Sequence, residues 1–300
     1  MDRLDAMSLF VATVEAGSLS AAGRRAGMPL ATVSRKLSEL EKHLGTRLLN
    51  RSTRRPTLTD AGQSYLTACR RILDEVSEAE RTAAGEYLSP TGELVISAPV
   101  VFGRLHVLPV VTDFLAIYPE VAIRLTLSDR ITQLVEEHID LALRIGELPD
   151  SALVATRVGT IRRIVCASPA YLAGRGVPAR PQDLAGHDCV TFEGLAAPAA
   201  WNFGAGKTEI VVPVRSRLQV NTAEAAIDAA ITGLGLTKVL SYQADAAVRA
   251  GALQVVLEPF EPPPWPVSLV HAGQGRLPVK LRAFLDLAAP RLKERLARSL

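Results

Sequence analysis

Cysteine is scarce in this chain of 300 residues: Cys69, Cys166 and Cys189 are its only three, and they lie far apart. An odd and scattered set predicts neither a disulfide framework nor a Cys-x-x-Cys metal site. We therefore expect buried or unreactive thiols and no bound metal, with redox sensing by two of the cysteines as the alternative.

Long apolar runs are also absent, because no stretch of about 18 residues, the length of a membrane span, is free of charge. The first residues, MDRLDAMSLFVATVEAG, are typical of an amphipathic helix rather than of a signal peptide. With 48% hydrophobic and 22% charged residues, the composition predicts a globular protein of about two domains that stays in the cytoplasm.

Enzyme motifs are incomplete. The segment GAGKT (204–208) would need a glycine where Trp201 stands to form a phosphate-binding loop. The GLG at 233–235 follows a helical pattern instead of opening one, and no Gly-x-Ser-x-Gly occurs. The His-Asp-Cys triplet at 187–189 is expected in a loop. We therefore expect neither enzymatic activity nor a cofactor.

Positive charge, by contrast, is concentrated near the N-terminus. Between Ser20 and Thr59, nine lysines and arginines stand against two glutamates, a local charge of +7 in a chain whose net charge is +3. Such a concentration indicates a polyanion or an anionic surface as the partner.

Three short helices are predicted in this region. The first, about 4–16, ends at Gly17, and the second starts near Ser20 and ends at Gly27. The third runs from Pro29, where the missing N–H of proline is tolerated, and closes at Gly45. Its apolar stripe, which we expect to be buried, consists of Val33, Leu37, Leu40 and Leu44.

The short step Gly27–Met28 between the second and third helices predicts a helix-turn-helix whose third helix enters the major groove of DNA. Arg35 and Ser34 lie where base edges would be read, and arginine can make a bidentate contact with guanine. A proline-punctuated loop anchored by Leu48 and Leu49 then predicts a wing on the phosphate backbone or minor groove. The predicted DNA-binding residues are Thr32, Ser34, Arg35, Lys36, Ser38, Arg51, Arg54 and Arg55.

Several linked motifs carry a family resemblance: the Ala-Ala pair of the second helix, VSRKLSELEKHLG, LLNR and LTDAG, in this order. The run 18–62 that contains them resembles the DNA-binding domain of LysR-type transcriptional regulators. One departure is Pro29–Leu30–Ala31, where the family usually has Ser, Thr or Gln. The resemblance implies an all-α winged helix-turn-helix over residues 1–59.

A long helix is predicted next, from the cap Thr59 to about Tyr87. Its narrow apolar stripe consists of Leu66, Cys69, Leu73, Val76 and Ala83. One helix cannot bury such a stripe, so we expect it to pair with a second copy, with packing against its own chain as the alternative. The resemblance likewise implies a linker helix, 60–88, that forms a homodimer, with a tetramer as the larger alternative.

From residue 93 to 300, strands and helices alternate, which predicts an α/β fold with parallel strands and helices on both faces. Helices are expected at 105–119, 130–139 and 277–296, among others.

For this part of the chain, the resemblance implies an effector-binding domain of two subdomains, similar to periplasmic binding proteins. The chain would cross between them near Ile161–Cys166 and Trp265–Val270. The first subdomain would then span 93–163 and 268–300, and the second 164–267.

A small effector is expected between the subdomains, beyond the carboxyl ends of strands, where helix N-termini direct N–H groups outward. The residues expected there are Pro99, Val100, Val101, Phe102, Ser128, Asp129, Arg144, Ile145, Gly146, Ala167, Ser168, Asn221 and Thr222. Capping or packing is the alternative role for each. Many relatives place Ser or Thr at the first of these loops to hold a carboxylate, whereas this chain offers only backbone donors there.

Two hypotheses follow. In the first, the chain is a sequence-specific DNA-binding transcriptional regulator whose dimers bind an imperfect palindrome. A small effector, a carboxylic or aromatic acid, would control it by favouring one arrangement of the subdomains. In the second, the chain is a cytoplasmic small-molecule-binding α/β protein or enzyme whose basic head docks to a protein or membrane.

Overall fold

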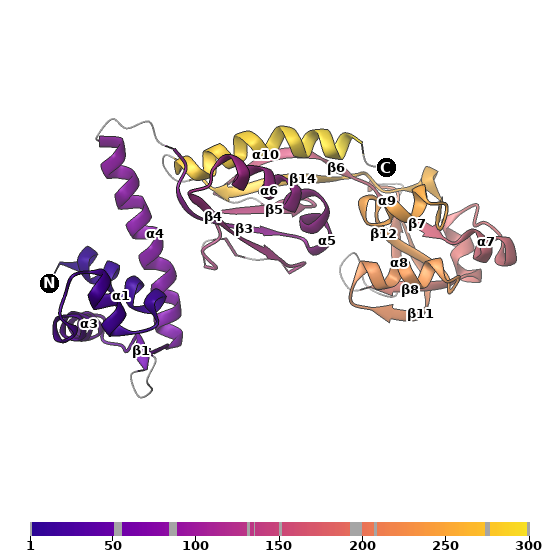
Figure 1. Ribbon diagram of the computed structural model, residues 1–300. Helices are drawn as coiled ribbons and strands as arrows, with labels where there is room; N and C mark the ends of the chain where they lie inside the picture. Colours follow the sequence, from indigo (N-terminus) through magenta and orange to yellow (C-terminus); the bar gives the residue numbers. More distant parts are fainter. Residues whose placement is uncertain are drawn as a thin grey trace. The chain divides into compact units, whose positions relative to one another are not determined.

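The computed structural model describes residues 2–50, 56–83, 89–130, 133–134, 136–149, 152–192, 200–206, 209–273 and 277–298 (Figure 1). The chain divides into two compact units, an N-terminal unit up to Gly92 and a C-terminal unit from Glu93. The division falls at residue 93, where the sequence predicts that the alternation of strands and helices begins.

The first two helices begin and end at residues that favour helix termini. α1 (Arg3–Ala16) ends at Gly17, which takes the left-handed conformation with φ 64°. α2 (Leu19–Arg25) is capped by Ser18 and not, as predicted, by Ser20: the Ser18 Oγ accepts a hydrogen bond from a backbone N–H of the first turn at 3.1 Å. The cap thus lies two positions before the predicted one, a difference within the usual uncertainty of helix ends.

The third helix, α3 (Leu30–Leu44), buries most of its apolar stripe as predicted. The exception is Leu44, whose side chain is 37% exposed because it lies in the last turn of the helix. The buried members of the stripe are Val33, Leu37 and Leu40.

A two-stranded hairpin follows α3. Its strands β1 (Leu49–Asn50) and β2 (Thr57–Leu58) pair antiparallel, and the segment 51–55 between them lies outside the described residues. Helix α4 (Asp60–Ala83) then starts at the predicted cap, since Thr59 Oγ1 accepts from the N–H of Gly62 at 2.9 Å. Its predicted continuation through 84–88 also lies outside the described residues.

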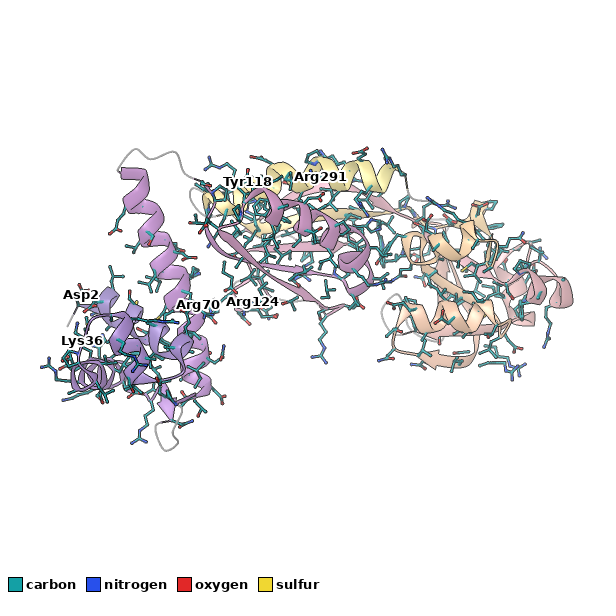
Figure 2. The ribbon with its side chains drawn as sticks, in the orientation of Figure 1. Asp2, Lys36, Arg70, Tyr118, Arg124 and Arg291 are labelled. Atoms are coloured by element: carbon teal, nitrogen blue, oxygen red, sulfur yellow. The ribbon has the colours of Figure 1, made fainter. Side chains whose placement is uncertain are left out.

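The apolar stripe of α4 divides into two parts. Leu66 and Cys69 are buried in the core of the N-terminal unit, where the alternative of packing against the same chain is correct. An ion pair between Arg70 and Glu15 of α1, at 3.0 Å, fastens the same stretch (Figure 2). Leu73 and Val76, further along, are only half-buried, and the side chain of Ala83 lies outside the described residues.

Two five-stranded sheets form the C-terminal unit. The first has the order β4-β3-β5-β14-β6, with β3 (Gly92–Ala98), β4 (Val121–Leu127), β5 (Leu141–Ile145), β6 (Leu153–Ile161) and β14 (Trp265–Ala272). The second has the order β11-β8-β12-β7-β13, with β7 (Arg163–Ala167), β8 (Asp188–Phe192), β11 (Arg215–Val220), β12 (Leu236–Leu240) and β13 (Gln254–Val256).

Both sheets are mixed, so the prediction of parallel strands was only partly correct. β3 and β5 are parallel, as are β8 and both its neighbours. β14 instead runs antiparallel to β5 and β6, and β7 runs antiparallel to β12 and β13. Neighbouring parallel strands are usually joined by a helical crossover. β14 instead enters the first sheet after the chain has passed through the second sheet.

The chain crosses between the two sheets twice. Arg162 forms the first crossing, within the predicted 161–166. The second lies between Phe260 and Trp265 rather than at 265–270, because β14 pairs with β6 from Trp265 onward. The two crossing segments are fastened together: the Arg162 guanidinium donates to the carboxylate of Glu261 at 2.8 Å.

Helices cover the first sheet. α5 (Val100–Phe102), a π-helical turn (Gly103–Val107) and α6 (Leu108–Ile117) form one uninterrupted stretch that begins earlier than the predicted residue 105. α10 (Val279–Ala297) lies beside α6 on the sheet (Figure 1), and an ion pair between Arg291 and Asp113 joins them.

The stretch 100–117 is the one described helix with the length and apolar composition of a membrane span. Buried core helices share these properties, and Phe102 and Phe114 are fully buried in the core of the first sheet.

The described residues of 130–139, namely 130, 133–134 and 136–139, do not form the predicted helix. In the described part of this segment, the chain makes a single turn: the Glu137 N–H donates to the Gln133 carbonyl and the Ile139 N–H to the Leu134 carbonyl. His138 takes a left-handed conformation with φ 53°, which closes the turn in the manner of a helix C-terminus.

In the second sheet's layer, the helices are α7 (Pro169–Arg175), α8 (Ala223–Ile231) and α9 (Ser241–Arg249). The hairpin of β9 (Ala200–Phe203) and β10 (Ile210–Pro213) encloses the GAGKT segment, of which 207–208 lie outside the described residues. The triplet 187–189 does not form the predicted loop, because Asp188 begins the buried strand β8.

Candidate functional sites

The side of α3 opposite its buried stripe carries the side chains predicted to contact DNA. Arg35 and Ser38 are exposed, while Thr32 and Ser34 are half-buried. The Ser38 hydroxyl donates to the Ser34 carbonyl oxygen at 2.9 Å, a bond within the helix. Arg35 is thus the basic side chain that the N-terminal half of α3 presents to solvent.

Lys36 is engaged elsewhere. Its ammonium forms an ion pair with Asp5 of α1 and is only partly exposed (Figure 2). The sequence pattern did not reveal this pair, because Asp5 lies 31 residues before Lys36 in the chain. A DNA contact by Lys36 stays a prediction, and it would require exchange of this intramolecular partner.

The turn between α2 and α3 is as tight as a helix-turn-helix requires. The Met28 N–H donates to the Gly23 carbonyl at 2.8 Å, which folds the connection back on α2. A Cβ at Gly23 would lie 2.7 Å from the Met28 carbonyl oxygen. Glycine at this position therefore allows α3 to begin this close to α2.

The basic residues of the N-terminal unit lie at its surface. Between residues 20 and 50, the exposed lysines and arginines are Arg24, Arg25, Arg35, Lys42 and Arg47. The predicted wing residues Arg51, Arg54 and Arg55 lie outside the described residues. The base of this wing is well anchored, since Leu48 and Leu49 are buried and Thr59 Oγ1 donates to the Arg47 carbonyl at 2.7 Å.

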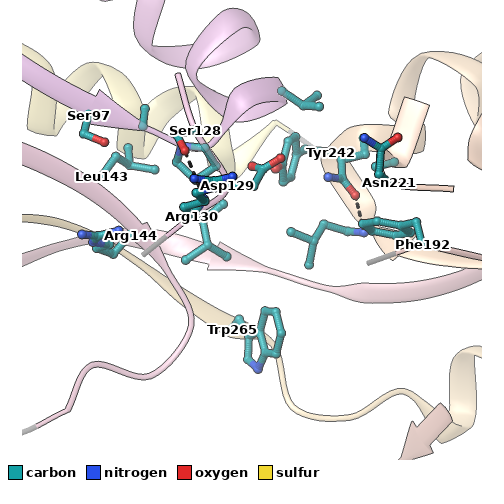
Figure 3. Close-up of a pocket in the computed structure, with 17 residues that line it drawn as sticks. Ser97, Ser128, Asp129, Arg130, Leu143, Arg144, Phe192, Asn221, Tyr242 and Trp265 are labelled. Carbon is teal, nitrogen blue, oxygen red and sulfur yellow. Dashed lines mark hydrogen bonds between the residues drawn. The ribbon is translucent and has the colours of Figure 1, made fainter. Parts of the chain in front are cut away.

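A cavity of about 170 Å³ lies in the C-terminal unit, lined by residues from both sheets and their helices (Figure 3). Of the residues expected at an effector site, those that line it are Pro99, Val101, Ser128, Asp129, Arg144, Ile145 and Asn221. Seven of the expected residues thus line one cavity, and an effector site there stays a prediction.

The remaining expected residues have other positions. Ser168 and Thr222 act as helix caps, their hydroxyls accepting from the N–H groups of Tyr171 and Ala225. Phe102 is buried in the core. The others outside the described lining are Val100, Gly146 and Ala167. Capping is thus observed for Ser168 and Thr222, and core packing for Phe102.

Sequence reasoning missed ten lining residues: Ser97, Ala98, Arg130, Leu143, Phe192, Ala223, Leu240, Tyr242, Gln243 and Trp265. Tyr242 and Gln243 follow the carboxyl end of β12, so the rule that found the other loops could have found them. Trp265 lies at the start of β14, where no local signal marks it.

The polar side of the cavity is basic on balance. Arg130 and Arg144 line it with Asp129, whose carboxylate accepts from the Val100 N–H at 3.0 Å. Burial lowers the pKa of Arg144, and the Glu137 carboxylate opposes this shift. Figure 3 shows the Arg130 N–H donating to Ser128 Oγ, at 3.2 Å. Arg144 is half-buried, whereas Asp129 and Arg130 are exposed. An excess of positive charge at a cavity favours an anionic ligand.

Behind the cavity, three rings pack across the two layers. The rings of Phe102 and Tyr242 lie 5.2 Å apart, and His106 lies 4.6 Å from Phe102 and 5.8 Å from Tyr242. Neither ring nitrogen of His106 has a hydrogen-bond partner among the described residues. Burial lowers the pKa of His106 to about 4, so its neutral form is the stable one in the folded protein.

The three thiols are all buried. Burial raises the pKa of Cys166 and of Cys189 to about 12, and that of Cys69 to about 11. Thiols with such values are poor nucleophiles at neutral pH. Among the described residues, no group of three or more His, Cys, Asp or Glu side chains is placed to bind a metal ion.

Both units match known protein families. Residues 4–63 match the bacterial regulatory helix-turn-helix protein of the lysR family, and residues 89–293 match the LysR substrate binding domain. The chain belongs to the LysR family. An HTH-type transcriptional repressor of Pseudomonas aeruginosa is 36% identical over 95% of this chain and 91% of that protein. A probable regulator of Klebsiella pneumoniae, LtrA, is 33% identical over 95% and 94%.

Solved LysR-type regulators have the same organisation. CrgA of Neisseria meningitidis, a LysR-type transcriptional regulator, matches with a TM-score of 0.61 at 30% identity, over 96% of this chain and 98% of that one. Full-length AphB, a virulence activator of Vibrio cholerae, matches with a TM-score of 0.60 at 28% identity, over 95% and 98%.

This LysR-family protein is thus a DNA-binding transcriptional regulator with an effector-binding domain in its C-terminal unit. Of the two hypotheses, the family match over the basic head decides in favour of DNA binding.

Proposed function

We propose that dimers of this regulator bind an imperfect palindrome, with one α3 in the major groove of each half-site. Arg35 and Ser34 read base edges there, and Arg51, Arg54 and Arg55 contact phosphates or the minor groove. The observation that carries the proposal is the arrangement of α3: its apolar stripe is buried in its own unit, while Arg35 is exposed on the opposite side.

The dimer is proposed to form through the second half of α4. Leu66 and Cys69 are already buried within the N-terminal unit, but Leu73 and Val76 continue the stripe and are only half-buried. A second α4 would cover them. Pairing of dimers into a tetramer is the larger alternative. The proposed location is the cytoplasm, and the proposed role involves no enzymatic activity.

The effector is proposed to be a small aromatic carboxylic acid. The cavity of about 170 Å³ has room for roughly one ring, since an engineered protein cavity of about 150 Å³ admits benzene. Phe192, Tyr242 and Trp265 supply aromatic surface, and Arg144 supplies the positive charge for a carboxylate. Binding between the two layers would favour one of their arrangements and so alter how dimers hold or bend DNA.

Arg35→Ala tests the DNA half of this proposal. On a preferred site, selected from a randomised duplex library, the variant should bind about 10–100-fold more weakly, because a bidentate contact with guanine contributes about 1–3 kcal/mol of discrimination. On a scrambled duplex the loss should be much smaller. Fluorescence anisotropy on both duplexes gives the ratio.

Lys42→Ala is the matched control. Lys42 is exposed in the last turns of the same helix, so its removal should weaken binding to both duplexes alike and flatten the salt dependence slightly. If Arg35→Ala kept the wild-type ratio between the two duplexes, base reading by Arg35 would be disproved.

Arg144→Gln tests the effector half. Benzoate and benzamide share a ring but differ in charge, and the wild type should bind benzoate about 10–100-fold more tightly, as expected for a charge-assisted hydrogen bond in a partly buried site. The variant should bind the two compounds alike. Isothermal titration calorimetry measures both affinities.

Arg124→Gln is the control here. Arg124 is an exposed arginine of the same unit that pairs with Glu93 at 3.8 Å and does not line the cavity (Figure 2). This variant should keep the preference for benzoate. Equal affinities of the wild type for benzoate and benzamide would overturn the proposed effector class while leaving the DNA-binding proposal intact.

A further inference from the structure

The first turn of α3 has an unusual surface for a DNA-binding helix. Pro29, Leu30 and Ala31 are all exposed, and none of their side chains can donate or accept a hydrogen bond. Leu30 is 52% exposed, although it belongs to the helix whose Leu37 and Leu40 are almost fully buried. Among the described residues, no side chain caps this end of the helix either.

The exposure of Leu30 is not explained by packing within the N-terminal unit. Its core takes in three other apolar residues of α3 and leaves Leu30 outside. A large apolar side chain in water gains free energy when a partner covers it. Pro29, Leu30 and Ala31 form a small exposed apolar surface at the N-terminal end of the helix. Ser34, Arg35 and Ser38, which follow along the helix, are polar or charged.

The major groove of DNA offers one apolar group on its base edges. Guanine, cytosine and adenine present hydrogen-bond donors and acceptors there, whereas thymine also presents its C5-methyl group. The side chains of Pro29, Leu30 and Ala31 cannot form hydrogen bonds with the base edges. They can pack against the methyl group of thymine, because this contact removes apolar surface of both the protein and the base from water.

We propose that Leu30, with Ala31 beside it, contacts the C5-methyl group of a thymine in each half-site and so determines specificity at that base pair. The inference rests on the proposed function, in which the N-terminal turn of α3 lies in the major groove. Arg35, a little more than one turn further along, reads its own base independently. Specificity would then combine one apolar and one hydrogen-bonded contact on the same helix.

Thymine-to-uracil replacement tests this contact without changing the protein, because uracil lacks only the methyl group and keeps the pairing edge. The starting duplex is the preferred site selected from the randomised library. In each test duplex, one thymine position is replaced by uracil, in both half-sites at once. One position should weaken wild-type binding about fourfold per half-site, the ratio that corresponds to burial of one methyl-sized group. Fluorescence anisotropy measures each duplex.

Leu30→Ala should bind the thymine and uracil forms of that duplex alike. Leu44→Ala is the matched control: Leu44 is an exposed leucine at the other end of the same helix, and its variant should keep the loss of about fourfold per half-site. Circular dichroism should show both variants folded, because each loses a side chain that is largely outside the core.

The outcomes separate this inference from the one on which it rests. If no thymine is methyl-sensitive in the wild type, or if Leu30→Ala keeps the sensitivity, the Leu30 contact is disproved. If the Leu30 contact is disproved but Arg35→Ala still relaxes the preference for the selected site, α3 remains the helix that contacts the bases. When neither variant changes site preference, the placement of α3 in the groove fails as well.

Discussion

Gly62→Ala is expected to destabilise the DNA-binding unit by about 3 kcal/mol or more and to abolish DNA binding, since overpacking against the backbone cannot be relieved by a rotamer change. A Cβ at this position would lie 2.0 Å from the carbonyl oxygen of Leu48 and 2.9 Å from its carbonyl carbon. The same carbonyl accepts the Thr59 N–H at 3.0 Å, and the Leu48 side chain is fully buried. Relief would require α4 to move away from the base of the wing.

Urea denaturation and anisotropy with the preferred duplex measure this effect. Gly174→Ala in α7 is the control, because that helical glycine has no atom within 4 Å of an added Cβ. It should be neutral or stabilise the C-terminal unit by about 0.5–1 kcal/mol, as expected from helix propensity. A Gly62→Ala protein with unchanged unfolding midpoint and DNA affinity would show that α4 and the wing pack more loosely than the structure indicates.

The helices of the DNA-binding unit could be predicted from sequence because their ends depend on local chemistry. Gly17 and Gly45 both take the left-handed conformation that closes a helix, and both were identified from residue type alone. Thr59 was identified as a cap by the same reasoning. Such interactions join residues a few positions apart, so a linear pattern contains all the information that they require.

Interactions between distant segments could not be predicted in this way. Lys36 is predicted to contact DNA because it lies on the polar part of α3, and its ion pair with Asp5 of α1 was not foreseen from the sequence. Leu66 and Cys69 were assigned to a dimer, yet the core of their own unit covers them. In both cases the sequence pattern did not reveal the partner within the chain, because the fold determines which distant side chains come together.

The effector cavity shows the same limit. Rules for α/β sheets place ligands at the carboxyl ends of strands, and they selected Ser128, Asp129 and Arg144, which line the cavity. The rules treat all strand ends alike, so they also selected Ser168 and Thr222, which cap helices. They missed Trp265, because the register of β14 in a mixed sheet determines its position.

The stability of the effector-binding unit is expected to fall as pH is lowered from about 6.5 to about 4, through the titration of His106. In the unfolded chain a histidine binds its proton near pH 6.5. In the folded protein, burial and the nearby Arg295 lower the pKa of His106 to about 4, while Asp245 raises it slightly. Between these values the unfolded state binds one proton more than the folded state, so acid favours unfolding, by up to about 3 kcal/mol at the lower end.

His106→Phe isolates this contribution from that of the carboxylates, because phenylalanine keeps a ring between Phe102 and Tyr242 but does not titrate. Unfolding free energies of wild type and variant are compared by urea denaturation at several pH values from 7.5 to 4. The difference between the two proteins should be constant above pH 7 and should change by about 3 kcal/mol in the variant's favour by pH 4. A difference that stays constant over the whole range would mean that His106 takes up its proton as readily in the folded state as in the unfolded state. The ring would then have to reach solvent or a hydrogen-bond acceptor, and the packing of the three rings across the two layers would have to open.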